Sequence, residues 1–196
     1  MNLNLSIDFT SLSFWAGVPS ALFLLRYAYQ VFTRQAPATG LATFLMWSIL
    51  DCLLLINTIR NGQPIWLPFG WVVGATTATI VLLIRGEWIW TWRETLSLVC
   101  ATLAAIASII FSGRGGLIAT IFAMLAAGMP ILIDNLKVPV RATFMLWFVT
   151  AVGCILSICG SDGSIDGTML PISSLLYNGF MAYIVLRKPK AALAAT

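Results

Sequence analysis

Seven long apolar runs, separated by short breaks, constrain this chain more than any other feature of its sequence. Each run holds roughly 20 mostly apolar residues, the length that an α-helix needs to cross the hydrocarbon core of a bilayer. The breaks are rich in Gly, Pro, Asn and charged residues, as turns are. The expected spans are residues 11–32, 40–59, 65–84, 92–112, 116–134, 140–159 and 168–186.

The charge content supports a membrane environment for these runs. Only 9% of the 196 residues are charged and 60% are hydrophobic, whereas a soluble domain has about 25% charged residues. So few charges cannot cover a water-facing surface. A membrane β-barrel would need alternating runs of about 10 residues, but the runs here are continuous. The sequence therefore predicts an all-α polytopic membrane protein with seven transmembrane helices.

Lys and Arg are divided unevenly between the two ends of the expected bundle. The end with the first, third and fifth connections and the C-terminus holds Arg34, Arg85, Arg93, Lys137, Arg141, Arg187, Lys188 and Lys190. The other end holds only Arg60 and Arg114. Because basic residues favour the cytoplasmic side, we expect the N-terminus outside and the C-terminus in the cytoplasm. The expected location is a bacterial inner (plasma) membrane.

A near-identical hexapeptide occurs twice, as ATFLMW at 42–47 and ATFMLW at 142–147, and each copy begins a span. A Leu-Pro pair likewise recurs in the third and seventh spans. Spans 1–3 therefore correspond to spans 5–7, and the fourth span restores the direction so that the two copies are parallel. The expected units are a repeat at 10–86, a linker helix at 92–112, a repeat at 116–188 and a tail at 189–196.

This 3+1+3 plan resembles the SWEET and PQ-loop transporter superfamily over nearly the whole chain. That family has a Pro-Gln pair near the cytoplasmic end of the first helix of a repeat. The first half of this chain has Tyr29-Gln30 there, followed by Arg34, and the second half has Pro130-Ile131. Each half thus contains part of the motif.

The resemblance implies transport of a small polar solute by alternating access between the two repeats, with proton coupling as an option. SWEET proteins bind sugar with paired Asn residues, but here Asn178 corresponds to about Ala75, flanked by Thr76, so sugar is not carried over as the substrate. One alternative is a vitamin-precursor carrier similar to the nicotinamide-riboside transporters. Another is a non-transporting receptor or assembly factor on the same scaffold, as the KDEL receptor is.

Asp51, near the middle of the second span, is the sharpest candidate for a functional residue. A carboxylate there costs roughly 2.5–3.5 kcal/mol and usually faces the bundle interior. The corresponding residue of the second half is Ala151, so the helix packing does not require the charge. Asp51 is expected to handle substrate or protons; the alternative is a structural pair or a hydrogen bond to a Thr. Arg26 either pairs with Asp51 or extends to the cytoplasmic surface.

Four further residues complete the candidate substrate site, namely Tyr177, Asn178, Thr76 and Gln30. For Tyr177 and Asn178 the competing interpretation is an interhelical hydrogen bond.

Four prolines inside the spans are candidate hinges: Pro19, Pro68, Pro130 and Pro171. Pro68 and Pro171 are expected in the first turn of their helices, where proline is tolerated. Pro19 and Pro130 are deeper, where each removes a backbone hydrogen bond and can kink the helix.

Catalytic chemistry is not indicated. The chain has no His, and its Ser, Cys and Asp residues form no recognisable catalytic or metal-binding pattern. We expect no enzyme activity, cofactor or metal. The expected partners are a small-molecule solute and membrane lipid, without nucleic acid; a homo-oligomer is left open.

Overall fold

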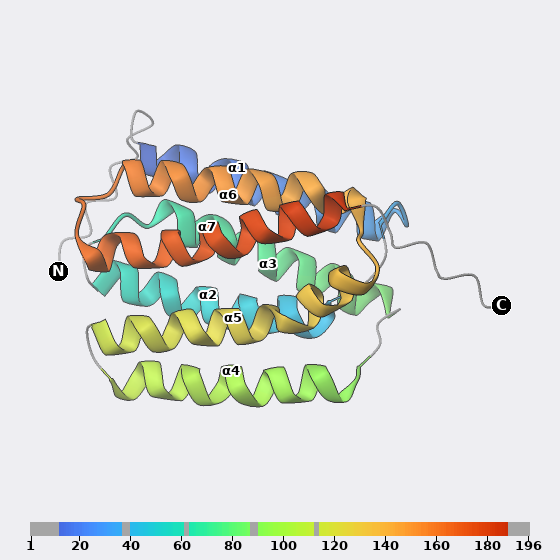
Figure 1. Ribbon diagram of the computed structural model, residues 1–196, viewed down its shortest axis with the longest axis horizontal. Helices are drawn as coiled ribbons and strands as arrows, with labels where there is room; N and C mark the ends of the chain where they lie inside the picture. The colour runs from blue at the N-terminus through green and yellow to red at the C-terminus, as the bar shows by residue number, and fades with distance from the viewer. Residues whose placement is uncertain (1–11, 37–39, 61–62, 87–89, 112–113, 188–196) are drawn as a thin grey trace.

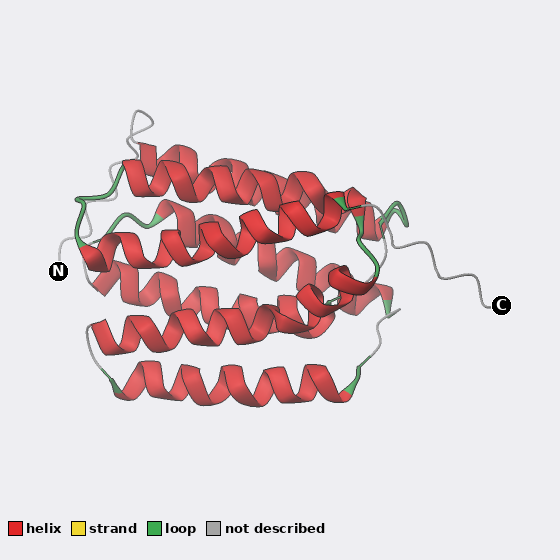
Figure 2. Cartoon of the chain, in the orientation of Figure 1, coloured by secondary structure: helices red, strands yellow, loops and turns green. Residues whose placement is uncertain are grey.

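The computed structural model describes residues 12–36, 40–60, 63–86, 90–111 and 114–187. All regular structure in these residues is helical (Figures 1 and 2). The helices are α1 (Leu12–Phe32), α2 (Leu41–Arg60), α3 (Trp66–Arg85), α4 (Trp92–Ile110), α5 (Arg114–Lys137), the 3-10 turn η1 (Arg141–Thr143), α6 (Phe144–Cys159) and α7 (Ile165–Leu186). The predicted tail at 189–196, and residues 10 and 11 of the first predicted repeat, lie outside the described residues.

Six helices, α2 to α7, are long and apolar enough to cross a membrane, with η1 counted together with α6. The helix α1 is not among them, because Arg26 and Gln30 lower its hydropathy. The outer surface exposes many large apolar side chains, including Ile109, Ile110 and Leu176. Apolar surface of this extent is unusual for a soluble monomer and suits contact with lipid. The chain is therefore an all-helical, polytopic integral membrane protein.

The helix ends follow local capping chemistry. At the start of α4, Thr91 and Glu94 form a capping box, which satisfies backbone N–H groups that lack helical partners. At the end of α3, Gly86 adopts φ 63° and its N–H donates to the Leu82 carbonyl, a conformation that glycine adopts at low cost.

The predicted start of the seventh span is wrong in detail. The Ser164 hydroxyl accepts a hydrogen bond from the Gly167 N–H at 3.0 Å, so α7 begins at Ile165 rather than at residue 168. Pro171 consequently lies inside α7 and not in its first turn. The sixth span begins with η1 before it becomes α-helical, and the Thr143 N–H donates to the Val140 carbonyl at 3.0 Å in that turn.

The helices run along a common direction, and α4 lies at the edge beside α5 (Figure 1). The helix α1 packs against α3 and α6, while α5 packs against α2, α4 and α7. The α1–α3 contact is close because glycines face each other. A Cβ on Gly70 would lie 2.4 Å from the Gly17 carbonyl oxygen. Only residues without a side chain allow the two backbones to approach this closely.

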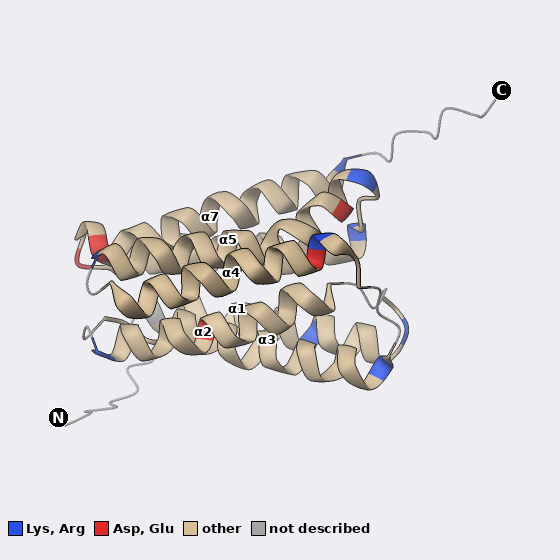
Figure 3. Cartoon of the chain, turned by 90° about the horizontal axis from the view of Figure 1, so that it is seen from below, with Lys and Arg blue, Asp and Glu red and all other residues tan. Residues whose placement is uncertain are grey.

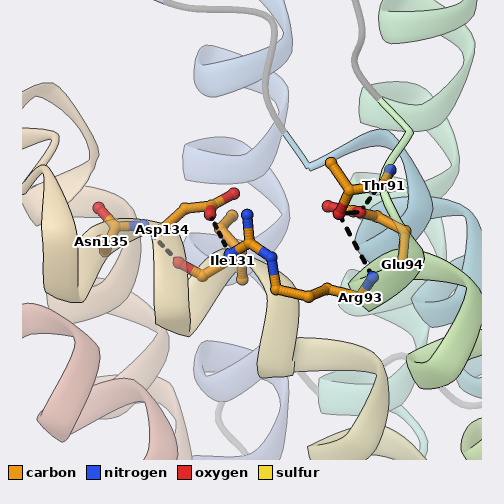
Figure 4. A network of polar contacts seen from close by, with 6 residues as sticks. All are labelled: Thr91, Arg93, Glu94, Ile131, Asp134 and Asn135. Carbon is orange, nitrogen blue, oxygen red and sulfur yellow. Dashed lines mark hydrogen bonds and ion pairs between the residues drawn. The ribbon is translucent and has the colours of Figure 1, made fainter.

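A polar network joins the start of α4 to the end of α5 (Figure 4). The Arg93 Nη1 atom lies 2.9 Å from the Asp134 Oδ1 atom. Next to it, the Asn135 side chain donates to the Ile131 carbonyl at 2.9 Å and accepts from the Val140 N–H at 3.1 Å. These contacts hold the α5–α6 connection against the bundle. Lys and Arg residues also gather at this end of the bundle, near the end of α7 (Figure 3).

Candidate functional site: a central cavity among six helices

A cavity with an empty volume of about 630 Å³ lies in the centre of the bundle. No described residue of α4 lines it. The lining side chains come from α1, α2, α3, α5, α6 and α7, and they are Leu24, Trp47, Asp51, Trp71, Ala75, Ile121, Met124, Leu125, Leu146, Trp147, Thr150, Leu170, Ser173, Ser174, Tyr177 and Asn178.

Three of the five predicted substrate-site residues meet in this cavity: Asp51, Tyr177 and Asn178. Thr76 does not line it, because the wall of α3 is formed there by its neighbour Ala75. Gln30 lines a second cavity instead.

Asp51 is buried in the cavity wall with only 3% of its surface exposed. Its Oδ1 atom has no hydrogen-bond partner. The structure forms no ion pair between Asp51 and Arg26, so the pairing that the sequence left open is absent. The physical reason is that the two side chains line different cavities. The Arg26 guanidinium carbon lies 5.9 Å from the centroid of the Phe23 ring instead.

Three aromatic rings contact one another in the wall of the cavity. The ring centroids of Trp47 and Trp147 are 6.1 Å apart, and Tyr177 lies 5.9 Å from Trp47 and 6.2 Å from Trp147, all in edge-to-face geometry. The two tryptophans are the last residues of the two hexapeptide copies. The repeated sequence thus places equivalent rings in contact with each other in the wall of one cavity.

The polar atoms of these rings are all occupied by the protein itself. The Trp47 Nε1–H donates to the Met124 carbonyl at 3.0 Å, and the Trp147 Nε1–H donates to the Thr143 hydroxyl at 3.1 Å. The Tyr177 hydroxyl donates to the Gly128 carbonyl at 2.9 Å. The three rings therefore offer π surface to a ligand, not N–H or O–H donors.

The helix α5 is held at its proline by neighbouring side chains. Pro130 has no N–H, so the Ala126 carbonyl lacks its usual helical donor. The Ser97 hydroxyl of α4 donates to that carbonyl. Close by, a Cβ on Gly128 would lie 2.5 Å from the Tyr177 hydroxyl oxygen, so the absence of a side chain there makes room for the ring.

Three of the smaller polar side chains of the cavity each donate one hydrogen bond within their own helix. The Thr150 and Ser173 hydroxyls donate to the Leu146 and Leu170 carbonyls, each at 2.8 Å. The Asn178 amide donates to the Ser174 carbonyl at 2.7 Å. Their oxygen atoms remain as acceptors. By contrast, the Trp71 Nε1–H is a buried donor without a partner.

A second, smaller cavity with an empty volume of about 300 Å³ lies between α1, η1 and α6. Arg26 and Gln30 contribute from α1, and Thr143 contributes from η1. Leu146 lines both this cavity and the central one. The two cavities are therefore neighbours with a shared wall residue.

No protein-family model, curated protein or solved structure matches this chain. Metal binding also finds no support in the described residues, which contain no group of three or more His, Cys, Asp or Glu able to hold an ion.

Sequence reasoning missed Trp71, Thr150 and Ser174 as cavity residues. A usable signal was present in the helical spacing, because residues four apart lie on the same face of a helix. Trp71 precedes Ala75 by four positions, and Ser174 precedes Asn178 by four. Extending Asn178 by one turn would have found Ser174, whereas Trp71 follows from Ala75 and not from the predicted Thr76.

Proposed function

We propose that this protein transports a small polar solute across a membrane by alternating access around the central cavity. The observation that carries the proposal is that six helices surround one cavity with a buried, unpaired carboxylate, that of Asp51. An unpaired ionisable group inside a membrane bundle is costly to fold and is typical of substrate and proton pathways.

The proposed mechanism uses two parallel three-helix repeats, α1–α3 and α5–α7. The helix contacts support this division because they pair up under it. The contact of α1 with α3 has its counterpart in α5 with α7, and that of α2 with α3 in α6 with α7. Across the interface, α1 meets α6 and α5 meets α2. Such repeats are related by an axis along the membrane normal and bind substrate at their interface.

The seven-span count, with the N-terminus outside in a bacterial inner membrane, completes this proposal. The proposal also includes a likeness to the SWEET and PQ-loop superfamily. The 3+1+3 plan supports this likeness. In the proposed orientation, the second cavity leads from Leu146 towards the cytoplasmic end, past Arg26 and Gln30. Pro19 and Pro130, which lie inside α1 and α5, are the proposed hinges for the rocking movement.

The test is release of solute from liposomes that contain the purified protein. The liposomes are loaded with a mixture of amines, amino acids, sugars and nucleosides, and mass spectrometry follows each compound. We expect at least one compound to leave faster than from protein-free liposomes. Ala75→Leu should slow its release at least tenfold, because Ala75 lines the cavity and the larger side chain occupies solute space.

The matched control is Gly179→Leu on α7, where an added Cβ meets no atom within 4 Å. This variant should release the compound as the wild type does. Release that is no faster than from protein-free liposomes, or that is equal for wild type and Ala75→Leu, would contradict transport through this cavity.

A further inference from the structure

The described residues that line the central cavity include an acidic side chain but no basic one. Asp51 is its only carboxylic acid, and no Lys or Arg is among the described residues that line it. The other titratable lining group is the Tyr177 phenol, whose hydroxyl is bound to the Gly128 carbonyl. A charge that the protein leaves without a counter-ion is one that a ligand can balance.

Among the free hydrogen-bonding groups of the cavity wall, acceptors outnumber donors. Thr150, Ser173 and Asn178 have each used a donor on a carbonyl of their own helix and keep oxygen acceptors. Asp51 adds the unpartnered Oδ1 acceptor. The free donors are fewer, namely the buried Trp71 Nε1–H, the second N–H of the Asn178 amide and the Ser174 hydroxyl. A ligand that satisfies this wall needs mainly N–H or O–H donors.

The aromatic wall favours a positive charge as well. Because the polar atoms of Trp47, Trp147 and Tyr177 are occupied, these rings interact with a ligand through their π systems. The negative face of an aromatic ring attracts cations, most strongly where water is excluded.

We propose that the central cavity binds a small organic cation whose charged nitrogen carries N–H donors, with Asp51 as its counter-ion and the aromatic rings around it. This inference rests on the proposed function, because it takes the cavity as the transport site and names the chemical class of the solute. Anions are disfavoured by Asp51. Neutral polyols would leave the carboxylate unbalanced.

The test compares probes that differ in charge but hardly in size, on the full-length protein in detergent. Isothermal titration at pH 7 measures benzylamine, benzyl alcohol and benzoate, and also butylamine and butanol. Both amines are protonated at this pH. At least one amine should bind at least tenfold more tightly than its alcohol, and benzoate should not bind. This comparison needs no mutation, so it holds even if a variant fails to fold.

The contribution of Asp51 is tested with Asp51→Asn, which keeps the size of the side chain and removes its charge. The preference for amine over alcohol should fall to less than threefold. Asp166→Asn is the matched control, because Asp166 pairs with Arg114 on the exposed end of the bundle. It should keep the preference of the wild type.

The outcomes separate this inference from transport itself. If neither amine binds, if the alcohols bind as tightly, or if the preference persists in Asp51→Asn, the cation site is wrong, even if a neutral solute is transported. If the amine binds in an Asp51-dependent way but does not leave loaded liposomes, the cation site stands and the transport proposal fails.

Discussion

The three helices before α4 and the three after it contribute different chemistry to one cavity. Trp47 in α2 and Trp147 in α6 contact each other in its wall. Four residues further along, α2 carries Asp51 and α6 carries Ala151. In turn α7 supplies Asn178, whereas α3 supplies Ala75. The carboxylate comes from the first set and the amide from the second. The two sets of helices therefore line the cavity with different polar groups.

The packing beside the cavity differs in a related way. A Cβ on Gly74 of α3 would lie 2.4 Å from the Leu24 side chain of α1. In the second set the small residue is Gly128 of α5, and the large one is Tyr177 of α7. Each set thus fills one contact with a large and a small residue, but on opposite helices. The exchange allows an aromatic ring to reach the cavity from α7.

The largest expected effect tests the carboxylate. Asp51→Asn should abolish solute accumulation driven by a pH gradient and retain downhill exchange, because the amide keeps the shape but cannot bind and release a proton. The melting temperature should not fall, since the variant removes a buried charge without a partner. Uptake into proteoliposomes with and without a pH gradient measures the first effect.

The opposite result would restore a purely structural role for Asp51. If Asp51 balances Arg26, Asp51→Asn should lower the melting temperature, and adding Arg26→Gln should raise it again. Wild-type uptake that is independent of pH, and unchanged in Asp51→Asn, would remove proton coupling.

The second prediction moves the carboxylate to the other set of helices. Asp51→Ala should lose transport, and the double variant Asp51→Ala/Ala151→Asp should recover part of it, severalfold above the single variant. The reason is that residues 51 and 151 each follow a cavity tryptophan by four positions. Uptake into proteoliposomes driven by a pH gradient, for which the carboxylate is proposed to be needed, is the measurement. A double variant that folds and stays inactive would show that the two sets are not interchangeable at this position.

The third prediction concerns the contact between Gly128 and Tyr177. Gly128→Ala should destabilise the protein by about 1–3 kcal/mol, because the added methyl group forces the ring to shift. Its control is Gly179→Ala in α7, where an added Cβ meets open space and stability should not fall. Thermal unfolding in detergent compares the two. Equal stability of both variants would show that the ring position is not restrained by this contact.

The fourth prediction tests the hydrogen bond at the proline of α5. Ser97→Ala should cost about 0.6 kcal/mol, the average for interhelical hydrogen bonds in membranes. In a Pro130→Ala background the cost should shrink, because residue 130 can then donate to the Ala126 carbonyl. A double-mutant cycle of unfolding free energies measures this coupling. Additive effects would mean that Ser97 does not compensate for the proline.

The smallest expected effect is at the α6–α7 connection, outside the membrane-spanning segments. Hydrogen bonds from Ser164 lower the pKa of Asp162, and the Ser164 N–H donates to the Asp162 Oδ1 atom at 2.9 Å. A pKa that is lowered in the folded state stabilises the protein at pH values above the ordinary pKa of Asp. This stabilisation is lost as the pH falls. The melting temperature of the wild type should therefore fall slightly on acidification. In Asp162→Asn this contribution to the fall should be absent. Identical profiles of melting temperature against pH for the wild type and Asp162→Asn would contradict this prediction.

Sequence by itself determined the helical class and the positions of the helices to within a few residues, and it predicted that Asp51, Tyr177 and Asn178 lie deep in the membrane. These properties follow from hydrophobic length and from the cost of burying polar groups in lipid, both of which are local in the chain. The repeated hexapeptide also indicated that Trp47 and Trp147 occupy equivalent places.

Only the tertiary structure decided which helix faces point inward. It separated Arg26 from Asp51, placed Thr76 and Gln30 outside the central cavity, and brought Trp71 and Thr150 into it. It also paired Ser97 with the carbonyl that Pro130 leaves free. The physical reason is that a helix in lipid is apolar on all sides, so its pattern of apolar residues does not mark the buried face as it does in water. Contacts between helices, set by shape and hydrogen bonding, make that choice.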